Sequence, residues 1–178
     1  MGGLQRGLIQ VYTGNGKGKT TAALGQALRA AGSGMKTLII QFMKDFPYGE
    51  LKAVQSLAPL IRIEQYGNDT FVLEKRPPDS KDKEAIMKAL ERSVEALESG
   101  EFDIVILDEV CVCFYFGLLK PQELIPVLET KPGNVELILT GRYCPEEILK
   151  KADLITEMRE VRHYYQQQGI TSRKGIEC

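Results

Sequence analysis

A glycine-rich stretch between an apolar segment and a helix-like segment constrains this chain most. It consists of Thr13, Gly14, Asn15, Gly16, Lys17, Gly18, Lys19 and Thr20, followed by Thr21. Residues 8–12 before it are typical of a short strand, and residues 21–28 after it favour a helix. In that context the backbone N–H groups of a curled loop and the N-terminus of the helix can hold a phosphate. We therefore predict a phosphate-binding loop.

Two side chains of this loop suit the chemistry of a bound polyphosphate. Lys19 would supply a mobile positive charge, and the Thr20 hydroxyl would face a bound magnesium ion. Thr13 departs from the usual motif, which begins with glycine. The alternative is a glycine-rich strand-to-helix turn that binds nothing. The spacing of Gly18, Lys19 and Thr20 favours phosphate binding.

Length and charge narrow the class of protein. The 178 residues fit one domain, with residues 1–178 forming a single nucleotide-binding unit. Lysine and arginine (23) nearly balance aspartate and glutamate (24), which argues against a nucleic-acid partner. No run of eighteen apolar residues indicates a membrane span, and the first residues lack the apolar stretch of a secretion signal. We expect a cytoplasmic protein.

The cysteines do not have the spacing of a zinc site. Cys111 and Cys113 lie in an apolar run where reduced cysteine serves as a small hydrophobic residue, and we expect Cys144 and Cys178 to be structural thiols too.

Strand-like and helix-like segments alternate along the chain. Apolar runs predict strands at residues 36–43, 101–107 and 135–139, and weaker patterns predict strands at 60–66 and 154–161. Helical patterns occur between them, so we expect an α/β fold of the P-loop (RecA-like) class with a mostly parallel central sheet flanked by helices. Residues 67–79 predict a surface loop in which Phe71 and Leu73 either contact a ligand or pin the loop down.

Polar residues follow two of the predicted strands. Asp108 and Glu109 end one strand and suit a magnesium ligand or a group that holds its water, although they could also be solvated acids. Arg142 follows another strand and suits a phosphate or ribose oxygen, or else a surface ion pair.

His163, the only histidine, favours a structural role. The tail at residues 171–177 is expected to fold back on the body or to fray.

Chemistry alone leaves three reactions open. The loop could serve phosphoryl transfer or nucleotide hydrolysis, or a nucleotide-gated binding module with residues 69–79 as the switch. A third possibility uses the triphosphate as a leaving group.

Five blocks of sequence carry a resemblance to a known family. They are residues 14–23, 41–44 (Gln-Phe-Met-Lys), 107–109 (Leu-Asp-Glu), 139–142 (Leu-Thr-Gly-Arg) and 174–177 (Lys-Gly-Ile-Glu). In this order and spacing they resemble the ATP:corrinoid adenosyltransferases of the P-loop type, over nearly the full length of the chain.

The resemblance implies the third reaction, in which a corrinoid reduced to Co(I) attacks the 5′ carbon of ATP and expels triphosphate. It implies ATP and a corrinoid as substrates, Mg²⁺ or Mn²⁺ as the metal, a reductase that delivers Co(I), and a homodimer. Thr20 and Glu109 match the metal positions of the family, and Arg29 and Arg142 match its nucleotide-contacting arginines.

The chain departs from the family pattern in its corrinoid-facing loop. That loop commonly carries a phenylalanine and, two residues on, a tryptophan; here Phe71 matches the first position and Leu73 occupies the second. Phe71 is therefore the expected corrinoid contact. Cys178 stands where an aromatic residue often closes the chain.

Overall fold

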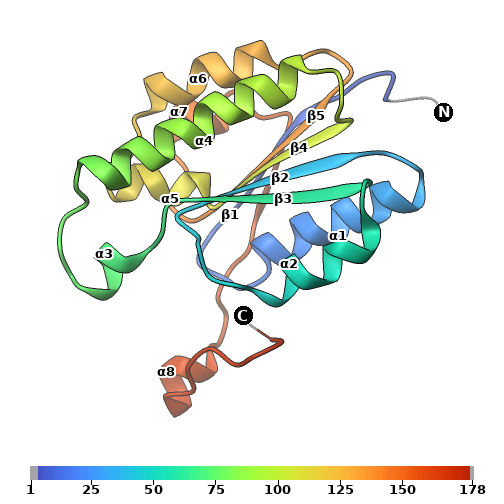
Figure 1. Ribbon diagram of the computed structural model, residues 1–178. Helices are drawn as coiled ribbons and strands as arrows, with labels where there is room; N and C mark the ends of the chain where they lie inside the picture. Colours follow the sequence, from blue (N-terminus) through green and yellow to red (C-terminus); the bar gives the residue numbers. More distant parts are fainter. Residues whose placement is uncertain (1–3, 177–178) are drawn as a thin grey trace.

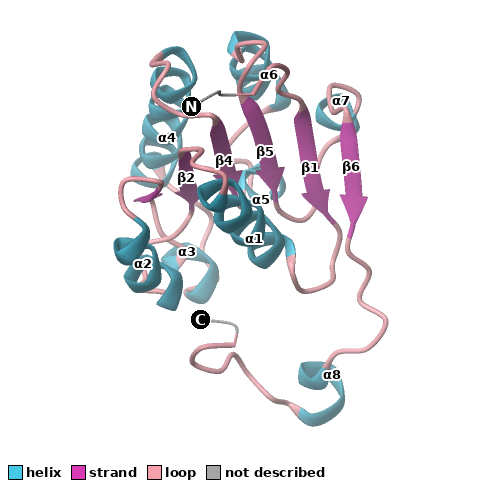
Figure 2. Cartoon of the chain, turned by 90° about the vertical axis from the view of Figure 1, so that its right-hand side faces the viewer, coloured by secondary structure: helices cyan, strands magenta, loops and turns pink. Residues whose placement is uncertain are grey.

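Six parallel strands form one sheet in this computed structural model, which describes residues 4–176. The strands are β1 (Ile9–Thr13), β2 (Thr37–Phe42), β3 (Ile61–Tyr66), β4 (Ile104–Asp108), β5 (Glu136–Thr140) and β6 (Leu154–Glu157), in the order β3-β2-β4-β5-β1-β6. Every neighbouring pair is parallel, which confirms the predicted class of sheet. All carboxyl ends therefore meet at one edge of the sheet (Figure 2).

Helices cover both faces of the sheet (Figure 1). One face carries α1 (Lys19–Gly32) and α2 (Gly49–Val54), which continues into a 3₁₀ turn at Gln55–Leu57. The other carries α4 (Ser80–Glu98), α5 (Val110–Tyr115), α6 (Pro121–Thr130) and α7 (Glu146–Leu149). Two short helices, α3 (Thr70–Leu73) and α8 (Tyr164–Gln168), lie toward the carboxyl edge.

The alternation of side chains along the strands explains this arrangement. In β2, Leu38 and Ile40 face the layer of α4 to α7, whereas Ile39 packs on α1. The α1 side of the core is built from small residues such as Ala23 and Ala27, so α1 can approach the sheet closely. This close packing fixes the N-terminal end of α1, where the glycine-rich loop enters it.

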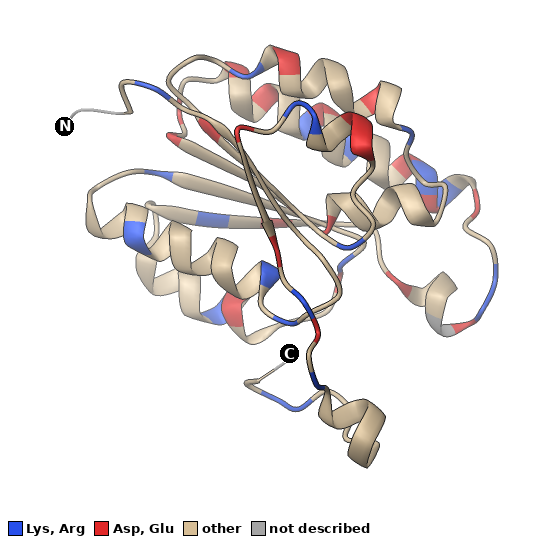
Figure 3. Cartoon of the chain, turned by 180° about the vertical axis from the view of Figure 1, so that it is seen from behind, with Lys and Arg blue, Asp and Glu red and all other residues tan. Residues whose placement is uncertain are grey.

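Charged residues of both signs are interspersed on the helices and loops, whereas the strands carry few of them (Figure 3). This is the distribution expected from the near balance of charges in the sequence. Among the described residues, no helix combines the length and apolar composition needed to cross a bilayer.

Two local predictions need correction, and one apolar run forms a helix that was not predicted. Residues 67–79 are not only a surface loop, because they contain α3, and Phe71 packs into the core against Phe116. The sixth strand ends at Glu157 rather than at residue 161. The apolar run after Glu109, predicted only as a site for buried thiols, forms the helix α5, in which Cys111 and Cys113 are indeed buried. Cys178 lies outside the described residues.

Candidate functional site

The glycine-rich loop joins β1 to α1 at the carboxyl edge of the sheet. Gly14 and Gly18 adopt positive φ angles of 93° and 118°, which L-residues with side chains rarely adopt. The loop also lies against the segment after β6: Gly16 donates its N–H to the Met158 carbonyl (2.6 Å), and Met158 donates to the Thr13 carbonyl (2.9 Å). A Cβ on Gly14 would lie 2.5 Å from the Met158 oxygen. The loop is thus held in its curl by the segment that follows β6 as well as by its own glycines.

Lys19 lies inside this curl. Its Nζ donates to the carbonyl oxygens of Gly14 and Gly16, both at 2.8 Å, and the side chain is buried. Burial lowers the pKa of Lys19, while Glu109 and Asp108 oppose that shift by stabilising the charge. The loop therefore encloses a positive charge, which an incoming polyphosphate would pair with.

Asp108 is the centre of a buried hydrogen-bond network. Its Oδ1 accepts from the hydroxyls of Thr20 (2.8 Å) and Thr140 (2.7 Å), and its Oδ2 accepts from the Gln41 amide (3.2 Å) and from Lys44 Nζ (2.7 Å). The residue is fully buried. Four donors, from the ends of β2 and β5 and from α1, thus fix the carboxylate and orient the Thr20 hydroxyl.

Lys44 is the residue of this site that no sequence argument assigned. Burial alone would lower its pKa, but the charge and hydrogen bond of Asp108 outweigh burial and raise the pKa of Lys44. Lys44 Nζ also lies over the Tyr48 ring, 5.3 Å from the ring centre. The only signal in the sequence was its place just after a predicted strand, in the block at residues 41–44.

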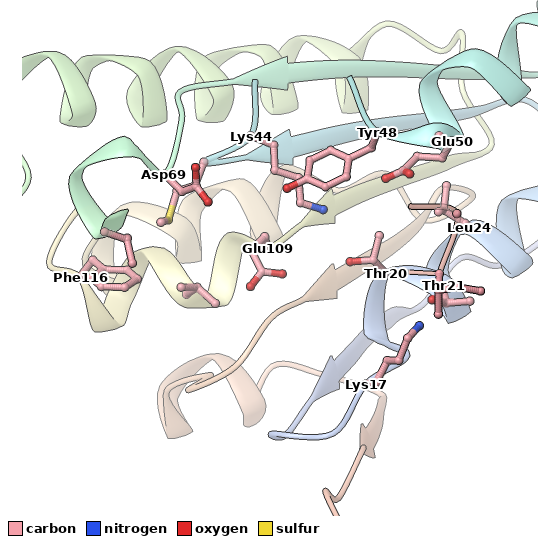
Figure 4. Close-up of a pocket in the computed structure, with 16 residues that line it drawn as sticks. Lys17, Thr20, Thr21, Leu24, Lys44, Tyr48, Glu50, Asp69, Glu109 and Phe116 are labelled. Atoms are coloured by element: carbon pink, nitrogen blue, oxygen red, sulfur yellow. The ribbon is translucent and has the colours of Figure 1, made fainter. Parts of the chain in front are cut away.

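Glu109 follows Asp108 in a strained conformation. Its φ of 67° is in the left-handed region, and its N–H donates to Thr140 Oγ1 at 2.9 Å. This bend turns the carboxylate out of the strand and toward the loop (Figure 4). Burial and the neighbouring Asp108 raise the pKa of Glu109, although Lys44 and Lys19 oppose the shift. Strain of this kind at a strand end is typical of functional sites.

Two cavities adjoin at this edge of the sheet. The larger has a volume of about 580 Å³ and the smaller about 410 Å³. They share Lys17, Thr20, Thr21, Glu109, Val112 and Phe116. The larger is also lined by Leu24, Met43, Lys44, Tyr48, Gly49, Glu50, Asp69, Val72, Gly175 and Ile176. The smaller is completed by Gly18, Lys19, Tyr115, Arg142 and Tyr143. We call them the larger and the smaller lobe of one cleft.

The structure brings most of the predicted site residues together. The cleft is lined by Lys17, Gly18, Lys19, Thr20, Thr21, Glu109 and Arg142. Asp108 lies beneath the cleft, where it accepts a hydrogen bond from Thr20. The loop is completed by Thr13, Gly14, Asn15 and Gly16. Arg29 lies apart, exposed in the last turn of α1, and it lines neither lobe. Phe71 is buried against Phe116 and also lines neither lobe, whereas its neighbour Val72 lines the larger one. The roles of Arg29 and Phe71 remain predictions.

The C-terminal segment returns to the cleft. After β6 the chain leaves the sheet, forms α8 and turns back, so that Gly175 and Ile176 line the larger lobe (Figure 2). This agrees with a tail that folds back on the body. His163 caps the N-terminus of α8, where its Nδ1 accepts the Tyr165 N–H at 3.1 Å, and this is a structural role of the kind that was expected.

The raised pKa of Glu109 predicts how the protein's stability depends on pH. In the folded chain the carboxyl loses its proton at a higher pH than in the unfolded chain, so it lowers stability as pH rises above the ordinary glutamate pKa. Glu109→Gln should therefore be more stable than wild type at about pH 8 and equally stable at about pH 4. Urea unfolding at both values, with a chelator present, measures the difference. A variant that is less stable at the higher value would contradict this prediction.

Comparisons with known proteins agree with this geometry. Residues 5–178 match the sequence model of the family described as ATP:corrinoid adenosyltransferase BtuR/CobO/CobP. The corrinoid adenosyltransferase CobA of Salmonella typhimurium is 35% identical over 174 residues, which are 97% of this chain and 86% of that protein. The corrinoid adenosyltransferase of Escherichia coli K12 is 34% identical over 97% of this chain and 86% of that protein. That of Pseudomonas aeruginosa is 30% identical over 97% of this chain and 84% of that protein.

The family model and the relatives match nearly the whole chain. The glycine-rich loop, the buried Asp108 and the strained Glu109 lie together at one edge of a parallel sheet, as expected for a nucleotide-binding member of that family. The chain belongs to the ATP:corrinoid adenosyltransferases, enzymes that transfer the adenosyl group of ATP to a corrinoid.

Proposed function

We propose that this cleft holds the triphosphate of ATP as a leaving group while a Co(I) corrinoid attacks the 5′ carbon. The cobalt electron pair forms the Co–C bond, the C5′–O bond breaks, and triphosphate departs with the electron pair of the C5′–O bond. The reaction requires no nucleophile or general base from the protein. The protein has to bind two substrates in line and to stabilise the negative charge that grows on the triphosphate.

The arrangement of cations carries this proposal. Lys19 lies inside the loop, while Lys17 and Arg142 line the smaller lobe beside it. Positive groups fixed before the reaction stabilise developing charge without having to reorganise. They lie on the phosphate side of the cleft. The larger lobe is lined by Lys17 and Lys44 too, but its wall also includes apolar residues such as Met43, Val72 and Ile176. That lobe suits the broad, weakly charged face of a corrin ring.

The donor set beside the loop fits Mg²⁺ or Mn²⁺. Thr20 donates its proton to Asp108, so the lone pairs of its oxygen remain for a cation, and the Glu109 carboxylate faces the same space. We assign these two as the metal ligands, with the phosphates of ATP supplying others. Asp108, whose two oxygens already accept four hydrogen bonds, holds Thr20 in place rather than binding the ion directly.

The remaining features of the proposal come from the family. We expect a cytoplasmic enzyme in which residues 1–178 act as one domain, a reductase that supplies Co(I), and a homodimer. Arg29, exposed on α1, would then contact the nucleotide from outside the two lobes.

The decisive experiment incubates the protein with ATP, magnesium and a chemically reduced corrinoid, and then analyses the phosphates and the visible spectrum. Triphosphate together with the spectrum of a new cobalt–carbon bond is the expected result. Formation of ADP and phosphate without corrinoid would indicate an ATPase or kinase instead. Tight nucleotide binding without turnover would indicate a nucleotide-gated binding module.

Phe71 should report on the corrinoid side of the site. Phe71→Leu removes the edge-to-face contact with Phe116, whose ring centre lies 5.2 Å away, and should lower the free energy of unfolding by about 1 kcal/mol. If the segment at residues 69–72 contacts the corrinoid, the KM for corrinoid rises while ATP affinity is unchanged.

Val72 provides a second test of this segment, because it lines the larger lobe and its side chain is exposed rather than part of the core. Val72→Asp should raise the KM for corrinoid with little loss of stability. Equal losses of corrinoid and ATP binding in both variants would show that this segment only supports the fold.

A further inference from the structure

Two tyrosines form an exposed stack beside the phosphate loop. The rings of Tyr115, at the end of α5, and Tyr143, after β5, lie 4.4 Å apart at an angle of 21°. Both are unusually exposed for aromatic residues, at 62% and 51%. Because stacked rings that stay in contact with water bury little apolar area, packing of the core does not explain why these two tyrosines lie together.

The stack is held in place from both sides. Tyr143 has a φ of 61°, a strained conformation for a bulky residue, directly after Arg142. Tyr115 meets the edge of Phe116 at 5.1 Å, and Phe116 in turn meets the buried Phe71. A chain of ring contacts thus anchors the exposed pair to the core.

We propose that the Tyr115–Tyr143 stack is a platform for the purine base of ATP. This inference rests on the proposed function, since it places the adenosine of the same ATP whose triphosphate lies on the loop. Both rings line the smaller lobe together with Lys17, Lys19 and Arg142. Cations beside an exposed aromatic face are the surroundings that suit an aromatic base joined to a polyanion.

The division of the cleft supports the base rather than the corrin ring as the occupant. The smaller lobe, of about 410 Å³, is within the usual size of small-ligand sites, and of the two lobes it alone is lined by Lys19 and Arg142. The larger lobe, whose wall includes Met43, Val72 and Ile176, remains free for the second substrate. Thr20 and Glu109 line both lobes, so the ribose of a nucleotide in the smaller lobe can lie where the two substrates meet.

Binding of Mg-ATP and of Mg-tripolyphosphate, measured by calorimetry without corrinoid, tests the platform. Tyr143→Gly removes one ring and suits the positive φ, while Tyr115→Ala removes the other. Each should weaken ATP binding about tenfold or more and leave tripolyphosphate binding unchanged, because only ATP carries a base. Tyr143→Phe should keep wild-type affinity, as should Tyr165→Ala, which removes an exposed tyrosine that lines neither lobe.

Three results would overturn the platform: unchanged ATP affinity in both variants, an equal loss of ATP and tripolyphosphate affinity, or a higher KM for corrinoid with normal ATP binding. The last would assign the stack to the corrinoid. Failure of the reaction itself gives a different pattern. If the wild type and the variants differ in ATP affinity as expected but the wild type forms no adenosylcorrinoid, the platform stands and the proposed reaction fails.

Discussion

Lys19→Ala is expected to reduce the rate of adenosylcorrinoid formation by at least about 10²- to 10³-fold, the typical cost of removing one fixed group that stabilises developing charge. Lys19 Nζ is held by two carbonyls of the loop, so its charge is already at the place where we propose that the triphosphate binds. The alanine variant leaves the leaving group without this cation. The initial rate of formation of the cobalt–carbon spectrum, at saturating ATP, measures the effect.

Two lysine variants separate this effect from a general loss of charge. Lys17→Ala removes an exposed lysine that lines both lobes, and should mainly raise the KM for ATP. Lys88→Ala removes an exposed lysine on α4 and should leave the rate unchanged. An unchanged urea midpoint for Lys19→Ala would show that the loss is catalytic. A wild-type rate in that variant would remove Lys19 from the mechanism.

Sequence patterns predicted the strands and the glycine-rich loop, because these features depend on residues that are close together in the sequence. The strands were recognised because a strand covered on both faces is apolar at nearly every position, as in β2 and β4. The loop was recognised because its glycines, lysine and threonine have a fixed spacing next to a helix. Asp108 and Glu109 were recognised as the end of a strand, and Asp108 meets Thr20 because the parallel strands end at one edge of the sheet.

Contacts between distant segments escaped prediction. Lys44 and Asp108 are 64 residues apart, and nothing local shows that they form a buried pair. The apolar run 110–116 has no polar face to reveal a helical period, so α5 could not be distinguished from a buried strand. Phe71 begins a short apolar stretch within an otherwise polar segment, and its partner Phe116, at the end of α5, is 45 residues away in the sequence. The order of the strands likewise follows from packing rather than from any single segment.

The buried Lys44–Asp108 pair should have the largest effect on stability. Lys44 Nζ lies 2.7 Å from Asp108 Oδ2, and the exposed fraction is 14% for the Lys44 side chain and 1% for the Asp108 side chain. Asp108→Asn removes the negative charge and leaves Lys44 buried without it, which should lower the free energy of unfolding by about 3–5 kcal/mol. The variant should also lose activity, because the Thr20 hydroxyl would no longer donate to a carboxylate.

A double variant distinguishes an unpaired charge from a lost hydrogen bond. In Asp108→Asn/Lys44→Met both charges are gone, so stability should recover by a large part of that loss even though a second residue has been changed. The exposed pair of Lys151 and Glu129, at 2.9 Å, is the matched control, and Glu129→Gln should cost less than about 1 kcal/mol. Urea unfolding measures all three. If the double variant is no more stable than Asp108→Asn, the cost lies in the hydrogen bonds of Asp108 to Thr20, Thr140 and Gln41 rather than in the uncompensated charge of Lys44.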